Sequence, residues 1–180
     1  MDKNSFEDRR KALEEAFFQK QDLQLLERMR KQEALTELAG ASGIADQAAL
    51  QSLAAAGVNA STLAALTLVP LIFVAWADRS MDDRERQAIL SAAADAGITK
   101  GGAAHGLVEH WLRQRPPMAL FDAWVRSVEA MDAGTATQIR AEVVDRAKKV
   151  AAAAGGFLGI GTVSAVETET IAKIERAFGG

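Results

Sequence analysis

Two short segments, about half a chain apart, carry the same pattern of residues. Residues 81–85 and residues 163–167 each consist of an apolar residue, a helix-capping residue, two variable positions and a glutamate, and an isoleucine follows four positions later. Each pattern predicts a capping box, in which the Asp82 or Ser164 side chain accepts a hydrogen bond from the amide three residues ahead while the glutamate accepts one from the amide of the capping residue. A pattern that recurs at this distance predicts two related helical units within one fold.

The composition is that of an ordinary globular protein with a strong preference for helix. Hydrophobic residues make up 49% and charged residues 25% of the 180 residues, which suits one core, or one domain with a helical appendage. Alanine is abundant, β-branched residues are sparse, and no stretch alternates apolar and polar residues as a strand does. We therefore expect an all-α fold, a single compact helical domain with an extra N-terminal amphipathic helix.

The charge and the lack of cysteine exclude several classes of function. The chain has no cysteine, so it has no disulfide framework and no thiolate that could bind zinc or act as a nucleophile. The formal net charge of −3 argues against a protein that binds the phosphate backbone of nucleic acids. The N-terminal residues are mostly polar or charged, and from this we expect no signal peptide and a cytoplasmic location.

Residues 5–38 form a highly charged segment without glycine or proline. The segment predicts one long amphipathic helix whose charges alternate in sign on a solvated face. Its narrow apolar stripe would consist of Leu13, Phe17, Leu26 and Met29. Residues 40–43, Gly-Ala-Ser-Gly, are the predicted linker. We therefore divide the chain into an interaction arm, residues 1–40, which is peripheral to the core, and a helical domain, residues 44–180.

No charged residue occurs between residues 47 and 77. Residues 58–77 are long enough to cross a bilayer, but Pro70 interrupts them and polar residues cluster at their start. The preferred interpretation is a short helix over residues 46–56, a turn, and a buried helix over residues 61–77 that Pro70 kinks or restarts. The expected core contacts of this buried helix are Leu63, Leu66, Leu71, Phe73, Val74 and Trp76.

Glycines, prolines and capping residues divide the rest of the chain into five further helices. Their expected limits are residues 82–96, 103–115, 118–131, 135–154 and 164–178. The glycine-rich segment between the last two, residues 155–161, follows an alanine-rich helix rather than a strand, and no lysine follows it. We interpret it as a sharp entry into the last helix and not as a nucleotide-binding loop.

Residues 73–85 resemble the signature of the tellurite-resistance TerB-like family. In that signature an apolar helix ends in Ala-x-Ala-Asp-Gly, and an apolar residue and a run of acids open the next helix. Residues 157–167 are similar to the second half-motif of such domains, and the resemblance extends over roughly residues 62–178. It implies an all-helical domain of pseudo-twofold arrangement. Arg79 stands where the family has glycine, and arginine adopts the left-handed backbone conformation at a cost of about 1 kcal/mol.

The resemblance also implies an acidic cluster that binds a metal cation. The matching residues are Asp78, Asp82, Asp83, Glu85 and Glu167, with Glu169 as a further candidate. Ligation by carboxylates alone would suit Ca²⁺ or Mg²⁺. Asp78 lies at a predicted helix C-terminus, where a negative charge is unfavourable unless a cation or a donor compensates it. The alternative is that Asp82, Glu85 and Glu167 serve only as helix caps, and we prefer this account, with no cofactor.

The sequence contains no pattern typical of an enzyme, such as Gly-x-Ser-x-Gly or a phosphate-binding loop with its lysine. Three hypotheses of function remain. The preferred one is a non-catalytic protein-interaction or scaffolding module of a bacterial TerB-like type, which uses residues 5–38 to contact a protein partner or a second copy. The second is a divalent-cation-binding stress protein. The third is a membrane-associated helical protein, which rests on the uncharged run alone.

Overall fold

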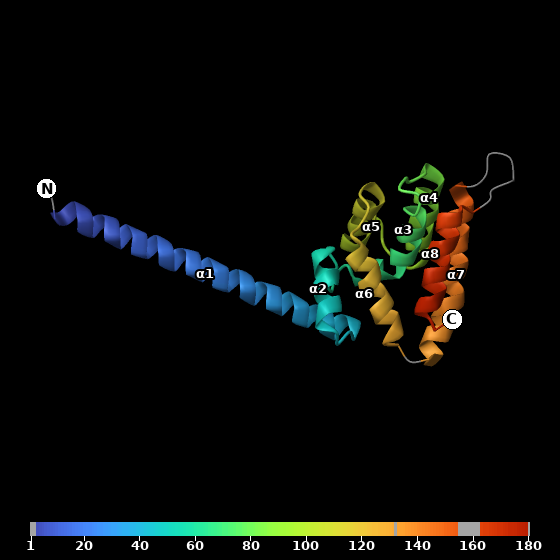
Figure 1. Cartoon of the computed structure of the whole chain (residues 1–180), viewed down its shortest axis with the longest axis horizontal. Helices are drawn as coiled ribbons and strands as arrows, with labels where there is room; N and C mark the ends of the chain where they lie inside the picture. Colours follow the sequence, from blue (N-terminus) through green and yellow to red (C-terminus); the bar gives the residue numbers. More distant parts are fainter. Residues whose placement is uncertain (1–2, 132, 155–162, 180) are drawn as a thin grey trace.

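The computed structural model describes residues 3–131, 133–154 and 163–179, and it confirms the all-α fold (Figure 1). Within these residues there is no β-strand, and the regular structure consists of eight α-helices and one 3₁₀ helix. In chain order these are α1 (Lys3–Ser42), α2 (Gln47–Ala55), the 3₁₀ helix η1 (Leu63–Leu68), α3 (Val69–Ala75), α4 (Asp83–Asp95), α5 (Ala103–Arg113), α6 (Met118–Glu129), α7 (Ala133–Ala154) and α8 (Ala165–Ala177). The helices expected after residue 80 match these limits to within two residues.

Helices α2 to α8 form a compact body around α3. The most extensive packing between α-helices is between α2 and α6, between α7 and each of α3 and α4, and between α7 and α8. All seven residues of α3 are buried. Phe73 of α3 contacts Phe121 of α6, with ring centroids 5.1 Å apart, and the aromatic cluster continues through Trp124 to Phe178. The prediction that the segment before residue 77 supplies the centre of the core is therefore confirmed.

The single helix expected over residues 61–77 is wrong in its first half. Residues Leu63–Leu68 form η1, and the α-helix begins again at Val69, which places Pro70 in its first turn. Proline has no amide hydrogen, and its ring clashes with the carbonyl four residues back, so an α-helix cannot run through it undisturbed, whereas the first turn of a new helix accepts it. Pro70 thus restarts the helix, which was one of the two effects expected of it.

The burial of the six predicted core contacts follows this division. The three that lie on α3 are buried, namely Leu71, Phe73 and Val74. The other three are only partly buried and pack against the edge of the core, namely Leu63, Leu66 and Trp76. Leu63 and Leu66 are three residues apart and share one side of η1, whereas Ala65 and Leu68 on another side of it are buried.

Two tryptophans connect three elements of the body by hydrogen bonds. The indole Nε1 of Trp76, at the end of α3, donates to the carbonyl of Trp111 on α5 at 2.8 Å. The indole Nε1 of Trp111 donates in turn to the carbonyl of Ala56, just after α2, at 3.3 Å. Both carbonyls lie at or near helix C-termini, where intrahelical donors are lacking. Each tryptophan therefore packs its ring in the body and also donates a hydrogen bond to a carbonyl near the C-terminus of a neighbouring helix.

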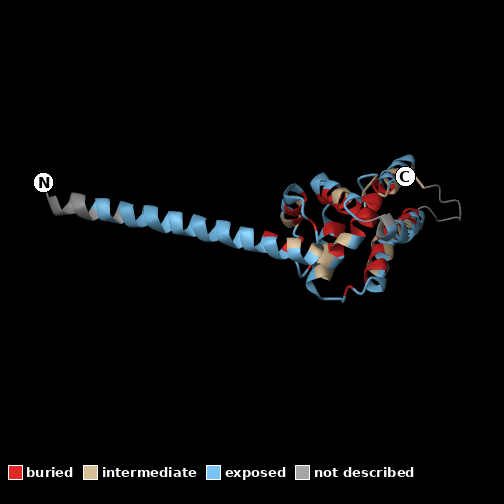
Figure 2. Cartoon of the chain, turned by 90° about the horizontal axis from the view of Figure 1, so that it is seen from below, coloured by how far each residue is buried: buried red, intermediate tan, exposed pale blue. Residues whose placement is uncertain are grey.

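Helix α1 projects from the body as one continuous helix of 40 residues (Figures 1 and 2). At 1.5 Å per residue its length is about 60 Å. Gly40 lies inside the helix, and the break comes at Gly43, whose φ of 70° is left-handed. The predicted linker is thus three-quarters helical, because one glycine costs a helix only about 1 kcal/mol. Leu35 and Leu38 are buried in the core, so the last turns of α1 belong to the body.

The uncharged run is divided among short elements. It comprises α2, a turn in which Gly57 has a φ of 89°, η1 and α3. In the part of the chain that the structure describes, no helix is long and apolar enough to cross a membrane. The glycine-rich segment, residues 155–161, lies outside the described residues, and the prediction made for it is not addressed by the structure.

Candidate functional site

The first capping box forms as predicted at the start of α4. The Asp82 carboxylate accepts from the amide of Arg84 at 2.7 Å, and Glu85 Oε2 accepts from the amide of Asp82 at 2.9 Å. The reciprocal pair of interactions that defines the motif is present. Two of the four amides that lack a partner at a helix N-terminus are satisfied in this way. The capping roles of Asp82 and Glu85 are therefore confirmed.

The second capping box forms at the start of α8. Ser164 Oγ accepts from the amide of Glu167 at 3.2 Å, and Glu167 Oε2 accepts from the amide of Ser164 at 2.6 Å. The same sequence pattern thus produces the same local structure at both positions. The capping roles of Ser164 and Glu167 are also confirmed.

The glutamates of the two boxes are buried and interact electrostatically. Glu85 is 4% exposed and Glu167 is 7% exposed. Burial, together with the negative charges of Glu167, Asp78 and Asp82, raises the pKa of Glu85 to about 7, although the hydrogen bond from the Asp82 amide lowers it. The starts of α4 and α8, far apart in the sequence, therefore face each other closely enough for their carboxylates to repel.

The loop between α3 and α4 contains Asp78 and Arg79. Asp78 Oδ1 accepts from both the amide and the hydroxyl of Ser80, each at 2.9 Å. Arg79 has a φ of 72° and is the one non-glycine residue with positive φ among those described. Arginine thus takes here the left-handed conformation that glycine adopts at lower cost. Asp78 has the compensating donors that a carboxylate after a helix C-terminus needs, and Ser80 supplies them.

The acidic residues do not form a ligand set for a cation. Asp83 is exposed, and its Oδ1 lies 3.8 Å from Nε of Arg86. Oε1 of Glu169 lies 3.0 Å from Nζ of Lys173. Over the described ranges, no three His, Cys, Asp or Glu side chains are grouped so that they could hold a metal ion. Asp82, Glu85 and Glu167 accept hydrogen bonds from amides of their own helix ends, which is the capping role preferred for them.

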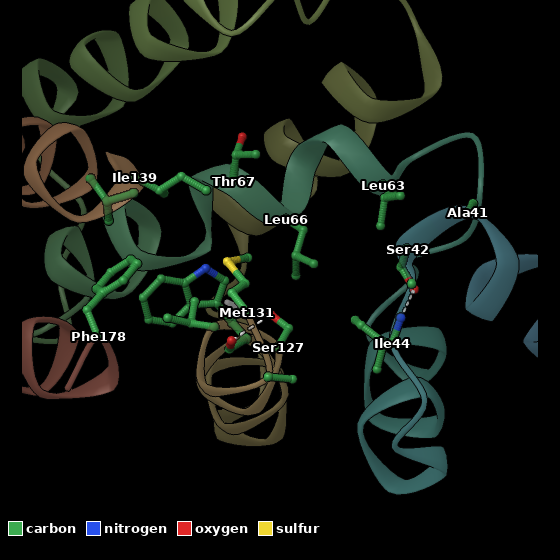
Figure 3. Close-up of a pocket in the computed structure, with 15 residues that line it drawn as sticks. Ala41, Ser42, Ile44, Leu63, Leu66, Thr67, Ser127, Met131, Ile139 and Phe178 are labelled. Carbon is green, nitrogen blue, oxygen red and sulfur yellow. Dashed lines mark hydrogen bonds between the residues drawn. The ribbon is translucent and has the colours of Figure 1, made fainter. Parts of the chain in front are cut away.

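An apolar cavity of about 330 Å³ lies between the end of α1, η1, α6, α7 and α8. Leu66, Met131 and Phe178 converge on it from three parts of the chain (Figure 3). No charged side chain lines it, and the hydroxyls in its wall, such as that of Ser127, donate to backbone carbonyls within the chain. Its chemistry can accommodate an uncharged apolar group and offers no acid, base or nucleophile.

The projecting part of α1 carries most of the exposed large hydrophobic side chains of the described chain. Of ten large hydrophobic side chains that are exposed, seven lie on this helix: Leu13, Phe17, Phe18, Leu23, Leu25, Leu26 and Met29. Phe18 and Met29 are each 60% exposed. Figure 2 shows that the buried residues concentrate in the body and that most of α1 is exposed. The exposed large apolar side chains of the described residues are thus concentrated on α1.

The single apolar stripe expected on α1 is wrong in detail. At 3.6 residues per turn, Leu13 and Phe17 share one face, whereas Phe18, Leu25 and Met29 share another, about a third of a turn away. The apolar residues are therefore not confined to one side of the helix. The sequence did show the pair Leu25 and Met29 at a spacing of four, which would have revealed the second face.

Comparison of the chain with protein-family models, with curated proteins and with solved structures finds no match. The resemblance to the TerB-like family thus rests on residues 73–85 and 157–167. Six residues of the second segment, 157–162, lie outside the described residues. What the structure establishes is the all-α fold, the two capping boxes and the exposed helix.

Proposed function

We propose that this chain is a cytoplasmic, non-catalytic protein-interaction module of TerB-like type, in which the body holds α1 out toward a protein partner. The observation that carries the proposal is the set of seven exposed apolar side chains on α1. On the part of the body that the structure describes, the exposed large apolar side chains are single and scattered: Met118, Met131 and Val166. A binding surface on α1 accounts for this uneven distribution.

The energetics of an isolated helix support the same proposal. Away from the body, α1 is a single helix, and in proteins most of the stability of a helix comes from packing of its apolar side chains. Burial of one large apolar side chain stabilises a complex by about 1.5–3 kcal/mol at most. A partner that covers several of the seven side chains therefore both stabilises the helix and binds with useful affinity.

Helix α1 runs from its projecting part into the body without a break, and this fixes its direction. Leu35 and Leu38 anchor the helix in the core, and the chain stays helical through Ser42. A partner bound to the projecting part is thus held at a defined direction from the body rather than on a flexible tether. This property suits a scaffolding role.

A five-residue variant tests the proposal in the full-length chain. Leu13, Phe17, Phe18, Leu25 and Met29 are replaced together by glutamine, which keeps a good helix former at each position. Because these side chains are exposed, the melting temperature of the body should stay unchanged, while self-association and the proteins retained by the tagged chain from native lysate should be lost.

The matched control replaces the exposed apolar side chains of the body, Met118, Met131 and Val166, by glutamine. This control should keep every association of the natural chain. If the α1 variant retained the same mass in solution and the same bound proteins as the control, the proposal would be wrong.

A further inference from the structure

Along α1, zones at equal distances on either side of the middle of the helix have net charges of opposite sign. Residues 3–11 contain four basic and two acidic residues, and residues 32–40 contain two acidic and no basic residues. Residues 12–16 contain two acidic and no basic residues, and residues 27–31 contain three basic and one acidic residue. Each zone on one side of the centre thus has a zone of opposite net charge at the same distance on the other side.

The central zone of α1, residues 17–26, is apolar and nearly uncharged. It contains Phe17, Phe18, Leu23, Leu25 and Leu26, with one lysine and one aspartate. All five apolar side chains are at least about half exposed, between 49% and 63%. The helix therefore has an apolar centre between two charged ends. Each charged zone on one side of the centre has a zone of opposite net charge at the same distance on the other side.

One face of the helix continues along this whole pattern without obstruction. Lys11, Phe18, Leu25, Met29 and Thr36 are separated by seven, seven, four and seven residues, so they lie on one side of the helix. Thr36 is exposed, although the neighbouring Leu35 and Leu38 are buried against the body. This face, which we call the seam face, is thus open from Lys11 to Thr36.

We propose that the partner of α1 is a second copy of this chain, and that the two α1 helices pair antiparallel through their seam faces about a centre between Gln21 and Asp22. This inference rests on the proposed function, since it names the partner that α1 binds. In such a pair residue i lies opposite residue 43 − i of the other copy. Phe18 of each copy then lies opposite Leu25 of the other, which buries the apolar centre against itself.

The charge pattern selects the antiparallel direction. In the antiparallel pair, residues 3–11 lie along residues 32–40 of the partner copy, and residues 12–16 lie along residues 27–31, so that every charged zone meets its opposite. In a parallel pair in register, each zone would meet its own copy, and like charges would repel along the whole helix. The resulting interface is the same patch on both copies, as a twofold axis requires.

Cross-linking through introduced cysteines tests the direction, because the chain has no cysteine of its own. Asp22→Cys lies at the centre of the seam face and should cross-link to itself with a short bismaleimide. Lys11→Cys should not, since the two copies of residue 11 lie about 30 Å apart in the antiparallel pair. A mixture of Lys11→Cys with Gln32→Cys should cross-link, because these positions lie opposite each other. Efficient cross-linking of Lys11→Cys to itself would overturn the antiparallel arrangement.

Sedimentation equilibrium of the full-length chain tests the pairing itself. Leu25→Glu places a charge in the seam and should convert the dimer to a monomer. Leu23→Glu changes a leucine on the other side of the helix, which is 63% exposed against 50% for Leu25, and should leave the dimer intact. A natural chain that stays monomeric across the dilution series, or equal masses for the two variants, would overturn the inference. A monomeric chain whose five-glutamine variant still loses a bound protein would leave the proposed function standing without the self-pairing.

Discussion

At the scale of single residues, Glu85 is both a hydrogen-bond acceptor in a capping box and a buried carboxylate. It accepts the hydrogen bond that closes a capping box, and burial together with the charge of Glu167 raises its pKa from 4.5 to about 7. A folded-state pKa above the unfolded value means that folding takes up a proton between these two values. The stability that this group contributes is thus fully present below pH 4.5 and is lost as the pH rises through about 7.

Glutamine at position 85 separates the effect of the capping hydrogen bond from that of the buried charge. Glu85→Gln keeps the acceptor for the Asp82 amide and removes the buried charge. At about pH 8 we expect the free energy of unfolding to rise by about 2–3 kcal/mol, and at about pH 4 we expect a change below about 0.5 kcal/mol. Urea unfolding at both pH values measures this. Glu169→Gln, on the exposed side of α8, should show no such difference, and an equal response of the two variants would contradict the burial of Glu85.

Arg79 is a second residue whose local conformation conflicts with its type. With a φ of 72°, its Cβ crowds the following carbonyl, at a cost of about 1–2 kcal/mol. Glycine has no Cβ, so we expect Arg79→Gly to raise the free energy of unfolding by about 1 kcal/mol. Arg86→Gly, in the regular part of α4, should lower it by about 1 kcal/mol. Thermal unfolding compares the two variants, and a loss of stability in Arg79→Gly would mean that the arginine side chain makes a stabilising contact.

At the scale of elements, helix ends were predictable and the backbone between them was less so. Asp82, Ser164 and Gly97 mark helix ends through hydrogen bonds or a left-handed φ that involve only neighbouring residues, and such local interactions can be recognised in a sequence. The division of residues 61–77 into a 3₁₀ helix and an α-helix was not predicted, because Pro70 is compatible with either a kink or a new start. Tertiary packing decides between the two.

The junction of α1 with the body gives a prediction for truncation. Because Leu35 and Leu38 are buried, deletion of residues 1–31 should leave the free energy of unfolding of the body nearly unchanged. Deletion of residues 1–40 removes both leucines and should lower it by about 3–6 kcal/mol. Urea unfolding monitored by tryptophan fluorescence distinguishes the two truncations. Equal stabilities would show that the last turns of α1 contribute nothing to the core.

At the scale of the whole molecule, some features arise only where distant segments of the chain pack together. The proximity of Glu85 to Glu167 and the cavity around Leu66 and Phe178 each depend on how helices pack. No spacing within one helix encodes such contacts, so the sequence indicated the capping residues but not their mutual repulsion, and it gave no sign of the cavity. The exposed apolar residues of α1 were partly visible, since Leu13 and Met29 already stood out in a charged segment.

The length of α1 has a consequence for how the molecule moves in solution. A compact chain of this size would have a radius of gyration of about 16 Å, but a rod of about 60 Å attached to the body raises this radius and slows rotation about the short axes. Small-angle X-ray scattering should therefore show a larger radius and a long tail in the distance distribution. If two copies pair as proposed, the bodies occupy opposite ends of one shared rod, and the distribution acquires a second maximum at their separation. The protein would then be a dumbbell that holds two identical heads at a fixed spacing.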